Sequence, residues 1–391
     1  MKVALIGTYL PRKCGIATFT SNLYENIRSK ENTCAVIAIN DGEDHDYPPE
    51  VIYQIGQDNI ADYISASEFL NKKVDVVYLQ HEFGIYGGQD GGYVIQLMKS
   101  LEMPVITTLH TIIDEPSAGQ AKILTEIARY SAQIIVMSET GKKMLCEIYD
   151  IEPGKIEIIG HGIPDPTQFQ PKNYREELGI GDKKVLLTFG LLSKTKGIEI
   201  VIKALPEVIQ KHPDTVYIVL GATHPHVVKY EGESYRDSLK ELIHQLNLEE
   251  HVIFIDRFVS QEELFGFLKL SDIYIIPYLS KKQITSGTLV YAMATNNAVV
   301  STPFWHAEEA LSDNRGIFFK FYDSNALAGI VNVLLHDEDL LKSYREKAMQ
   351  YANQYDWKNI GNQYVLLFNK ISLSRLKRIG KTKENEKISR A

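Results

Sequence analysis

The sequence predicts an α/β protein with two Rossmann-like domains. Apolar, β-branched runs of strand length alternate with segments of helix length along most of the chain. This alternation is typical of parallel sheets that are covered by helices on both faces. It stops in a proline-rich and charged stretch that begins at Ile163 and then starts again. A chain of 391 residues also exceeds the usual size of a single hydrophobic core.

The first predicted domain covers residues 1–165. Its expected strands are the apolar runs at 2–10, 34–40, 74–83, 104–110, 132–138 and 155–162. Its expected helices include 18–28, 93–101, 120–130 and 139–149. The run at the N-terminus lacks a cleavage site and is too short to span a bilayer, so we interpret it as the first strand.

The second predicted domain covers residues 184–355, after a linker at 166–183. Its expected strands are 184–192, 215–223, 251–258, 273–279, 298–304 and 316–321. Ser260 and Glu263 have the spacing of a capping box, which predicts a helix start at this point. A last helix at 356–378 is expected to return to the first domain. The basic tail at 379–391 is expected to be disordered.

Composition narrows the function classes. A formal net charge of -8 argues against a nucleic-acid-binding protein, which needs a basic surface. Cys14, Cys34 and Cys146 have no metal-type spacing and are too few for a disulfide framework. We therefore expect a cytoplasmic protein whose contact with a membrane is at most peripheral, through its basic tail. The sequence does not indicate an oligomeric state.

The carboxyl ends of the strands are where ligands bind in open parallel sheets. Two such domains facing one another would place their strand-end loops on one cleft. In the second domain, Ser286, Gly287 and Thr288 open a helix after the strand at 273–279. A helix start with a glycine and two hydroxyls favours a bound phosphate, because its amides lack partners and the helix dipole attracts anions.

A second predicted anion site lies in the same domain. Gly190 ends the strand at 184–192, and Lys194, Lys196 and Gly197 come just before the next helix. Lysine is a compact cation that suits phosphate oxygens. The two sites together predict a binding site for a phosphate group.

The first domain offers polar residues in its strand-end loops. Gly15 and Ile16 precede a helix after the first strand, without the GxGxxG fingerprint of dinucleotide-binding domains. His81, Glu82 and Tyr86 lie among glycines after the strand at 74–83. These five residues are the candidate ligand-binding residues of these two loops.

His110 ends the strand at 104–110 and is the expected contact to a reacting group. No metal site is expected. The acidic loop around His45 and the pair His224 and His226 are both better explained as surface.

These features together resemble the GT-B glycosyltransferases, specifically retaining family 4. The features are the glycine loop after the first strand, the strand-end histidine, the FG and KG loop of the second domain, and the small-residue helix start before AMA. The resemblance covers nearly the whole chain. It implies two Rossmann-like domains facing across a cleft, and transfer of a sugar from an activated donor without a metal.

The resemblance also implies roles for single residues. Lys196 matches the lysine that holds the donor diphosphate, and residues 286–288 match the helix start that holds it through backbone amides. His110 matches the histidine near the transferred sugar. Gly15 and Ile16 match the glycine loop near donor and acceptor. The resemblance gives the acceptor side to the first domain, and we expect Gly15, Ile16, His81, Glu82 and Tyr86 to bind the acceptor.

Three positions depart from the family pattern. Gln283 and Tyr291 stand where the family has two glutamates, one on the donor sugar and one on the nucleotide ribose. Leu191 stands where the family has an arginine on the diphosphate. We expect Gln283 and Tyr291 to contact the donor differently and Lys194 to supply the missing charge.

The sequence therefore predicts a retaining, metal-independent hexosyltransferase that uses a nucleotide diphosphate sugar and a carbohydrate acceptor and needs no cofactor. Glucose or mannose is the expected sugar from family habit alone. Two alternatives stay open. One is a retaining phosphorylase that uses a sugar 1-phosphate, and the other is a sugar-binding protein without turnover.

Overall fold

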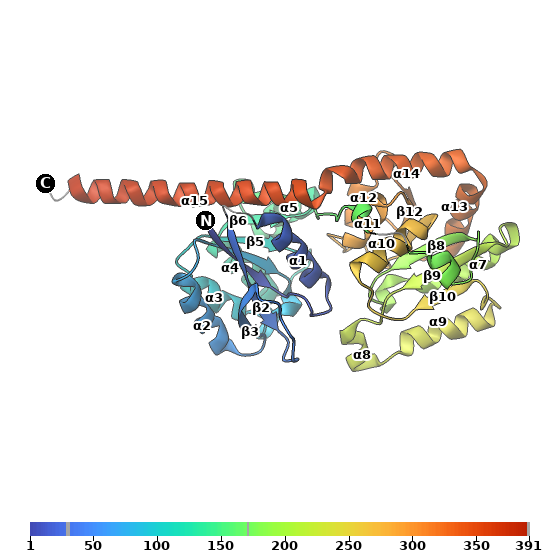
Figure 1. The fold of residues 1–391 in the computed structure, drawn as a ribbon, viewed down its shortest axis with the longest axis horizontal. Helices are drawn as coiled ribbons and strands as arrows, with labels where there is room; N and C mark the ends of the chain where they lie inside the picture. The colour runs from blue at the N-terminus through green and yellow to red at the C-terminus, as the bar shows by residue number, and fades with distance from the viewer. Residues whose placement is uncertain (29–31, 170–171, 389–391) are drawn as a thin grey trace. The chain divides into compact units, whose positions relative to one another are not determined.

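The structure, a computed structural model, describes residues 1–28, 32–169 and 172–388. The chain forms two compact units, Met1–Gly162 together with Trp357–Ala391, and Ile163–Asp356. Each unit is a parallel sheet with helices, coloured blue to green and green to orange in Figure 1. Residues 170 and 171 of the expected linker lie outside the described residues, as do residues 389–391 of the expected tail.

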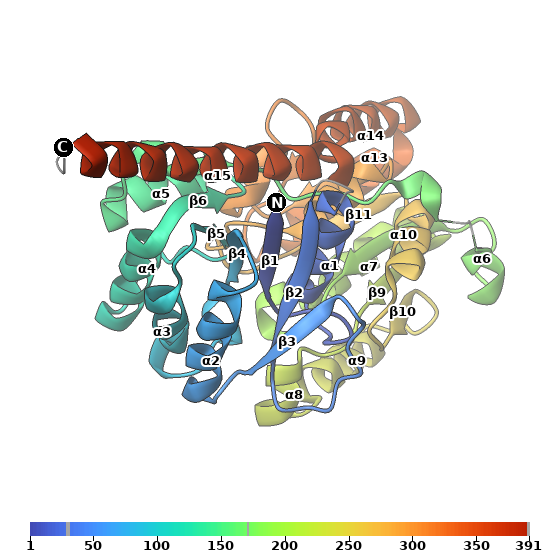
Figure 2. The same ribbon diagram turned by 60° about the vertical axis from the view of Figure 1, so that its left-hand side comes forward.

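Unit 1 contains a seven-stranded parallel sheet in the order β3-β2-β1-β4-β5-β6-β7. Its elements are β1 Lys2–Gly7, α1 Gly15–Ile27, β2 Thr33–Asn40, β3 Val51–Gly56, α2 Ile60–Asn71, β4 Val76–His81, α3 Tyr93–Ser100, β5 Val105–Leu109, α4 Ala118–Tyr130, β6 Ser131–Val136, α5 Glu139–Tyr149, β7 Ile156–Ile158 and α15 Trp357–Ile388. Helices α2, α3 and α4 lie side by side in Figure 2.

The sequence did not predict β3 and α2. Strand β3 lies at the edge of the sheet, and half-buried and exposed residues alternate along its first four positions. It follows the acidic, proline-containing loop at 41–49. An edge strand with one wet face lacks the continuous apolar run that marks the inner strands.

Unit 2 contains a six-stranded parallel sheet in the order β10-β9-β8-β11-β12-β13. Its elements are α6 Tyr174–Glu177, β8 Lys184–Phe189, α7 Ile198–Lys211, β9 Thr215–Leu220, α8 Pro225–Glu231, α9 Ser234–Gln245, β10 Val252–Ile255, α10 Gln261–Leu270, β11 Ile273–Ile276, α11 Gly287–Ala294, β12 Ala298–Ser301, α12 Trp305–Ala310, β13 Ile317–Phe318, α13 Ser324–His336 and α14 Glu338–Ala352. All six strands lie within the predicted runs. The predicted capping box of Ser260 and Glu263 is confirmed.

Successive residues along the strands of unit 2 feed two separate cores. Leu186 packs with residues of α7, α9 and α13, while Leu187 packs with residues of α10, α11 and α14. Side chains alternate between the two faces of a strand, so a sheet with a core on each face needs apolar residues throughout. This explains why continuous apolar runs predicted these strands.

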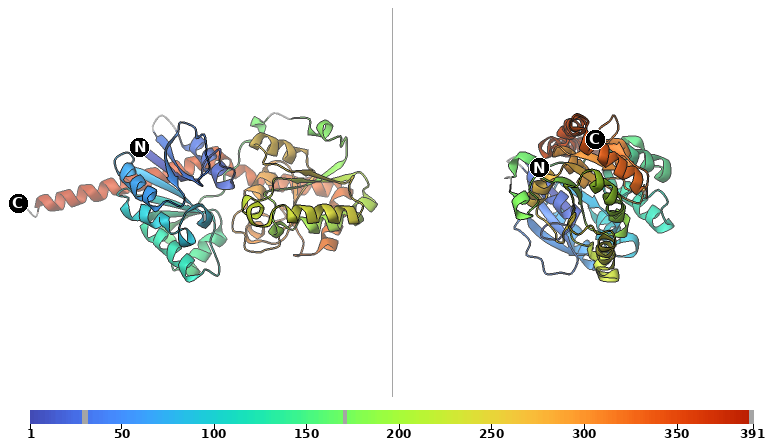
Figure 3. Two further views of the ribbon diagram at one scale, coloured as in Figure 1. Left: turned by 90° about the horizontal axis from the view of Figure 1, so that it is seen from below. Right: turned by 90° about the vertical axis from the view of Figure 1, so that its right-hand side faces the viewer.

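The last helix, α15, belongs to unit 1. It packs on α1, its Trp357 ring contacts the Phe19 ring at 5.1 Å between centroids, and Tyr364 contacts Tyr78 of β4 at 5.3 Å. The left view of Figure 3 shows the ribbon of α15 passing along unit 1 and continuing beyond its sheet. Residues 379–388 form the end of this helix in the structure, whereas the sequence predicts disorder there. Lysine and glutamate are good helix formers, so the charged composition does not by itself stop a helix.

A pair of helical glycines gives a test of this packing. A side-chain carbon at Gly361 of α15 would lie 2.7 Å from the Asn26 carbonyl oxygen of α1, whereas one at Gly329 of α13 would meet nothing within 4 Å. We expect Gly361→Ala to lower the free energy of unfolding of unit 1 by about 1–3 kcal/mol, because the helices must separate. Gly329→Ala should instead stabilise unit 2 by about 0.5–1 kcal/mol, since alanine is the better helix former.

Urea unfolding measures both changes. Trp357 reports on unit 1 and Trp305 on unit 2 when the other tryptophan is replaced by phenylalanine, because the chain has only these two. Equal signs for the two substitutions would contradict the close approach of α15 to α1.

Candidate functional site

The order of the strands determines where the predicted site residues lie. In both sheets the chain moves outward from a central strand in one direction and then in the other, so β1 lies next to β4 and β8 lies next to β11. Loops that follow such neighbouring strands diverge and leave a crevice at the carboxyl edge, where ligands bind. The predicted anion site of unit 2 lies in the loops after β8 and β11.

The loop after β8 is held against the chain that follows β11. Gly197 adopts a φ of +65°, and a side-chain carbon there would lie 2.1 Å from the Pro277 carbonyl oxygen. The Leu279 amide donates a hydrogen bond of 3.0 Å to the Thr195 carbonyl. As a result, the Lys196 ammonium nitrogen lies 3.9 Å from the centre of the Tyr278 ring.

The start of α11 joins the same cluster. Ser286 caps the helix by accepting a 3.3 Å hydrogen bond from the Leu289 amide, and its own amide donates to His306 Nδ1 at 2.9 Å. Its hydroxyl lies 3.1 Å from the Thr288 hydroxyl, which lies 3.4 Å from the Tyr278 hydroxyl. The first amides of a helix have no partner within it, so Gly287 and Thr288 present donors at this point.

Tyr278 was not predicted from the sequence. The signal was present, because Tyr278 and the preceding Pro277 come directly after a buried apolar strand. Burial raises the pKa of its phenol, but the positive charge of Lys196 and hydrogen bonds with Thr288, Lys196 and Ser286 outweigh burial, so the pKa is lowered. The cluster of Lys196, Tyr278, Ser286 and Thr288 therefore favours negative charge, and we call it the anion cluster.

Gly190 lies beside open space. Its φ of +146° is one that glycine tolerates, and a side-chain carbon there would meet nothing within 4 Å. Gly190, Thr188, Leu192 and Lys196 line one small pocket. The glycine predicted from its place at a strand end thus adjoins the anion cluster.

Three predicted donor residues have partners outside the anion cluster. Lys194 forms a 2.7 Å ion pair with Glu231 of α8, so its charge is matched by a carboxylate. The Gln283 side-chain amide donates to the carbonyl of Thr285 in its own loop at 2.6 Å. Tyr291 is buried in the core, where its ring packs on Phe265. The structure therefore places Tyr291 as a packing residue of α11.

His110 lies at the carboxyl end of β5, as predicted. Its Nε2 lies 2.6 Å from the Gln80 side-chain oxygen, and its ring meets Phe19 edge-on at 5.0 Å. Burial, followed by the charges of His161 and His81, lowers the pKa of His110 to about 3. His110 is thus neutral near pH 7, and when Nε2 donates to Gln80, its Nδ1 presents a lone pair.

His81 and Tyr86 lie inside unit 1. Both side chains are buried, their rings stack with an interplanar angle of 11°, and the Tyr86 hydroxyl donates to the Gln80 carbonyl at 2.6 Å. Glu82 accepts hydrogen bonds from the Phe83 amide and the Thr111 hydroxyl, while burial raises the pKa of its carboxyl. The structure thus gives His81 and Tyr86 a role in shaping the loop, where the sequence predicts contact with an acceptor.

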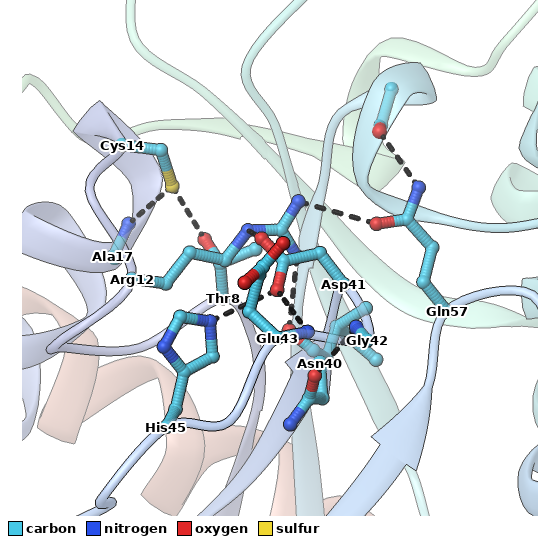
Figure 4. Close-up of polar contacts among 12 residues, drawn as sticks. Thr8, Arg12, Cys14, Ala17, Asn40, Asp41, Gly42, Glu43, His45 and Gln57 are labelled. Carbon is cyan, nitrogen blue, oxygen red and sulfur yellow. Dashed lines mark hydrogen bonds and ion pairs between the residues drawn. The ribbon is translucent and has the colours of Figure 1, made fainter. Parts of the chain in front are cut away.

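Gly15 and Ile16 open α1 after the Cys14 cap, whose sulfur accepts from the Ala17 amide at 3.3 Å (Figure 4). A side-chain carbon on Gly15 would meet nothing within 4 Å. The packing of the chain itself therefore does not require a glycine at this position, which is consistent with close approach of a ligand.

Arg12 holds the same loop against the ends of β2 and β3. Its guanidinium forms a 3.1 Å ion pair with Asp41 and donates to Ile39 and Gln57 at 3.1 and 3.2 Å. His45 also contacts Asp41, at 2.9 Å.

Within the part of the chain that the structure describes, no three His, Cys, Asp or Glu side chains are grouped to hold a metal ion. No described helix is long and apolar enough to cross a bilayer.

Comparison with known proteins identifies the two units. Residues 14–165 match the family model for Glycosyltransferase Family 4, and residues 170–351 match that for Glycosyl transferases group 1. The chain carries the two domains of the GT-B glycosyltransferase fold. The fold predicted from the sequence is confirmed.

Two curated relatives and one solved structure show the range of similarity. The chain is 27% identical over 262 residues to an uncharacterized glycosyltransferase of Methanocaldococcus jannaschii, covering 63% of this chain and 62% of that protein. It is 28% identical over 230 residues to a D-inositol 3-phosphate glycosyltransferase of Corynebacterium urealyticum, covering 57% and 53%. The chain thus spans less than two thirds of the length of these relatives. HepE of Anabaena, solved in complex with UDP, superposes with a TM-score of 0.77 at 17% identity, covering 95% of this chain and 100% of HepE.

The buried histidines of this GT-B domain predict acid sensitivity. Burial lowers the pKa of His81 to about 3 and that of His161 to about 4. Because the unfolded chain binds these protons below about pH 6.5 and the folded unit does not, stability is lost as pH falls from about 6.5 toward 4. Each such histidine should contribute about 1.4 kcal/mol per pH unit in that window.

Urea unfolding at pH 7, 6 and 5, followed by Trp357 fluorescence in a Trp305→Phe background, measures this loss. His81→Phe, which keeps a ring against Tyr86, should make the dependence on pH shallower. The exposed His244→Gln in unit 2 serves as the control. An unchanged slope in His81→Phe would show that His81 is not held neutral.

Proposed function

We propose that this protein is a retaining glycosyltransferase that moves a hexosyl group from a nucleotide diphosphate sugar to a carbohydrate acceptor. The carrying observation is the anion cluster of unit 2, in which Tyr278 contacts both Lys196 and Thr288, and the Thr288 hydroxyl lies beside that of Ser286 at the start of α11. HepE, whose fold is similar, is solved with UDP and with UDP-glucose. UDP is therefore the first ligand to test.

In the proposed reaction, the bond from the anomeric carbon to the donor phosphate breaks and negative charge grows on the leaving diphosphate. Lys196 and the amides of Gly287 and Thr288 would stabilise that charge more strongly in the transition state than in the bound donor. The departing phosphate oxygen takes the proton of the acceptor hydroxyl as the new glycosidic bond forms on the same face. Under this proposal the chain needs no pair of catalytic carboxylates, no metal and no cofactor.

Unit 1 contributes the acceptor side in this proposal. The open space beside Gly15 supports close contact of the loop before α1 with a substrate. His110 is neutral and held by Gln80, so its other ring nitrogen can accept a hydrogen bond from a sugar hydroxyl. Glu82, beside Thr111 at the same sheet edge, is a further candidate for binding acceptor hydroxyls.

A phosphorylase that uses a sugar 1-phosphate is the second candidate, and one observation favours it. The Tyr291 ring is buried, so it does not replace the carboxylate that would hold a ribose. A donor without a ribose has no need of that contact. Phosphate-dependent cleavage of an oligosaccharide, with no response to nucleotides, would support this candidate over the transferase.

Removal of Lys196 tests the transferase. Lys196→Ala deletes a charged hydrogen-bond donor to the diphosphate, a contact worth about 1.5–3 kcal/mol, so UDP affinity should fall about 10- to 100-fold. Turnover of a nucleotide sugar should fall further, since the contact strengthens in the transition state. Isothermal titration and a coupled assay for nucleoside diphosphate release measure the two effects.

Lys240→Ala, an exposed lysine on α9, is the matched control and should change neither quantity. The proposal fails if the wild-type protein binds UDP and Lys196→Ala binds it equally well.

A further inference from the structure

Tyr278 contacts both halves of the anion cluster, which are Lys196 in the loop after β8 and Thr288 at the start of α11. It lies after β11, its ring packs on Phe304 at 5.1 Å, and its carbonyl accepts a 2.7 Å hydrogen bond from the Thr302 hydroxyl. The side chain is only 5% exposed. These core contacts hold Tyr278 in place, with its ring and hydroxyl facing the anion cluster.

The Tyr278 ring contacts Lys196 through a cation–π interaction. In the described part of the chain Lys196 forms no ion pair, whereas its neighbour Lys194 is paired with Glu231. A carboxylate would hold an ammonium but would cancel its charge toward a ligand. An aromatic face attracts the cation through its quadrupole and leaves the full positive charge in place.

The hydroxyl points to the other half of the cluster. It lies 3.4 Å from the Thr288 hydroxyl, which in turn lies 3.1 Å from that of Ser286 at the start of α11. One side chain therefore joins the loop after β8 to the helix after β11.

We propose that Tyr278 is a positioning residue of the donor site. Its ring holds Lys196 without neutralising it, and its hydroxyl sets Thr288, so that both groups are in place before a diphosphate binds. This inference rests on the proposed function, because it assigns the anion cluster to a diphosphate. Preorganised charge of this kind costs no rearrangement when the leaving group departs.

The phenol also sets an upper pH limit for the site. The titratable and charged groups that face it are Lys196 from the loop after β8 and Tyr274 from β11, with the hydroxyls of Ser286 and Thr288 from α11 and the apolar ring of Phe304 before α12. Burial raises the pKa of Tyr274, whereas that of Tyr278 is lowered. When Tyr278 loses its proton as pH rises, the phenolate pairs with Lys196 and cancels the charge that the diphosphate needs.

The two parts of the side chain can be tested separately. Tyr278→Phe keeps the ring and removes the hydroxyl, while Tyr278→Leu removes both. NMR of protein labelled with carbon-13 at the lysine ε positions reads the ring contact directly, because a ring face shifts the Lys196 methylene protons upfield. Lys196→Arg assigns the signal.

We expect the upfield signal in wild type and in Tyr278→Phe, and its loss in Tyr278→Leu. UDP affinity at pH 7 should stay within about threefold of wild type in Tyr278→Phe and fall about tenfold in Tyr278→Leu, since a cation–π contact at a desolvated site is worth about that much. Between pH 7 and 10, UDP affinity should decline in wild type and hold to higher pH in Tyr278→Phe.

Tyr322→Phe and Tyr322→Leu, at a tyrosine that is 65% exposed, are the controls and should match wild type. An unshifted Lys196 signal in wild type overturns the inference, as does an alkaline decline in Tyr278→Phe equal to that of wild type. If Tyr278→Leu does not fold, the Lys196 signal of wild type and the pH dependence of Tyr278→Phe still test the inference. A wild-type protein that shows the shifted signal but binds no UDP would instead overturn the proposed function and leave the ring contact intact.

Discussion

The candidate chemistry of unit 2 depends on one close approach of two backbone segments. At Gly197 the chain passes so near the Pro277 carbonyl oxygen that a side-chain carbon would come within 2.1 Å of it. Only glycine fits such a contact and also adopts its φ of +65° without strain. This contact lays the loop after β8 on the chain after β11, and so brings Lys196 to Tyr278. Without it, the two halves of the anion cluster would belong to separate loops.

The strand order makes this approach useful. Because β8 and β11 are neighbours while the chain leaves them in opposite directions, their loops lie at the edge of the sheet where open parallel sheets bind ligands. Unit 1 repeats the arrangement with β1 and β4, and it places Gly15 and Glu82 at the corresponding edge. The same topology in both units explains why every predicted site residue except Tyr291 lies between the last residue of a strand and the first turn of the next helix. It also fits the match of each unit to a glycosyltransferase family model.

Much of the fold could be predicted because buried parallel strands are apolar throughout and glycines mark the turns at their ends. The prediction of an anion site at Lys196 and residues 286–288 rests on the same reasoning, since helix starts after such strands expose donors. Partners far apart in the sequence could not be predicted. The Tyr278 ring, the Gln80 amide at His110, and the pairing of Lys194 with Glu231 all depend on which loops meet in three dimensions.

The burial of single side chains was the second property that could not be predicted from the local sequence. His81 and Tyr86 stand in a glycine-rich, polar stretch that is typical of an exposed loop, yet their rings stack in the interior of unit 1. Tyr291 lies on the helix face that packs on Phe265, and its place in a family motif gave no information on its direction. A polar or aromatic residue near a strand end can serve the ligand or the core, and only its neighbours decide which.

The central claim is that the start of α11 and Lys196 receive the phosphates of a nucleotide donor. Amide NMR of nitrogen-15 labelled protein during a titration with UDP tests it most directly, because a phosphate bound at a helix start must perturb the amides that contact it. The account predicts large, saturable shifts for Gly287 and Thr288, with no comparable change at Gly329 in α13. Saturable binding of UDP that leaves the Gly287 and Thr288 amides unmoved would contradict it.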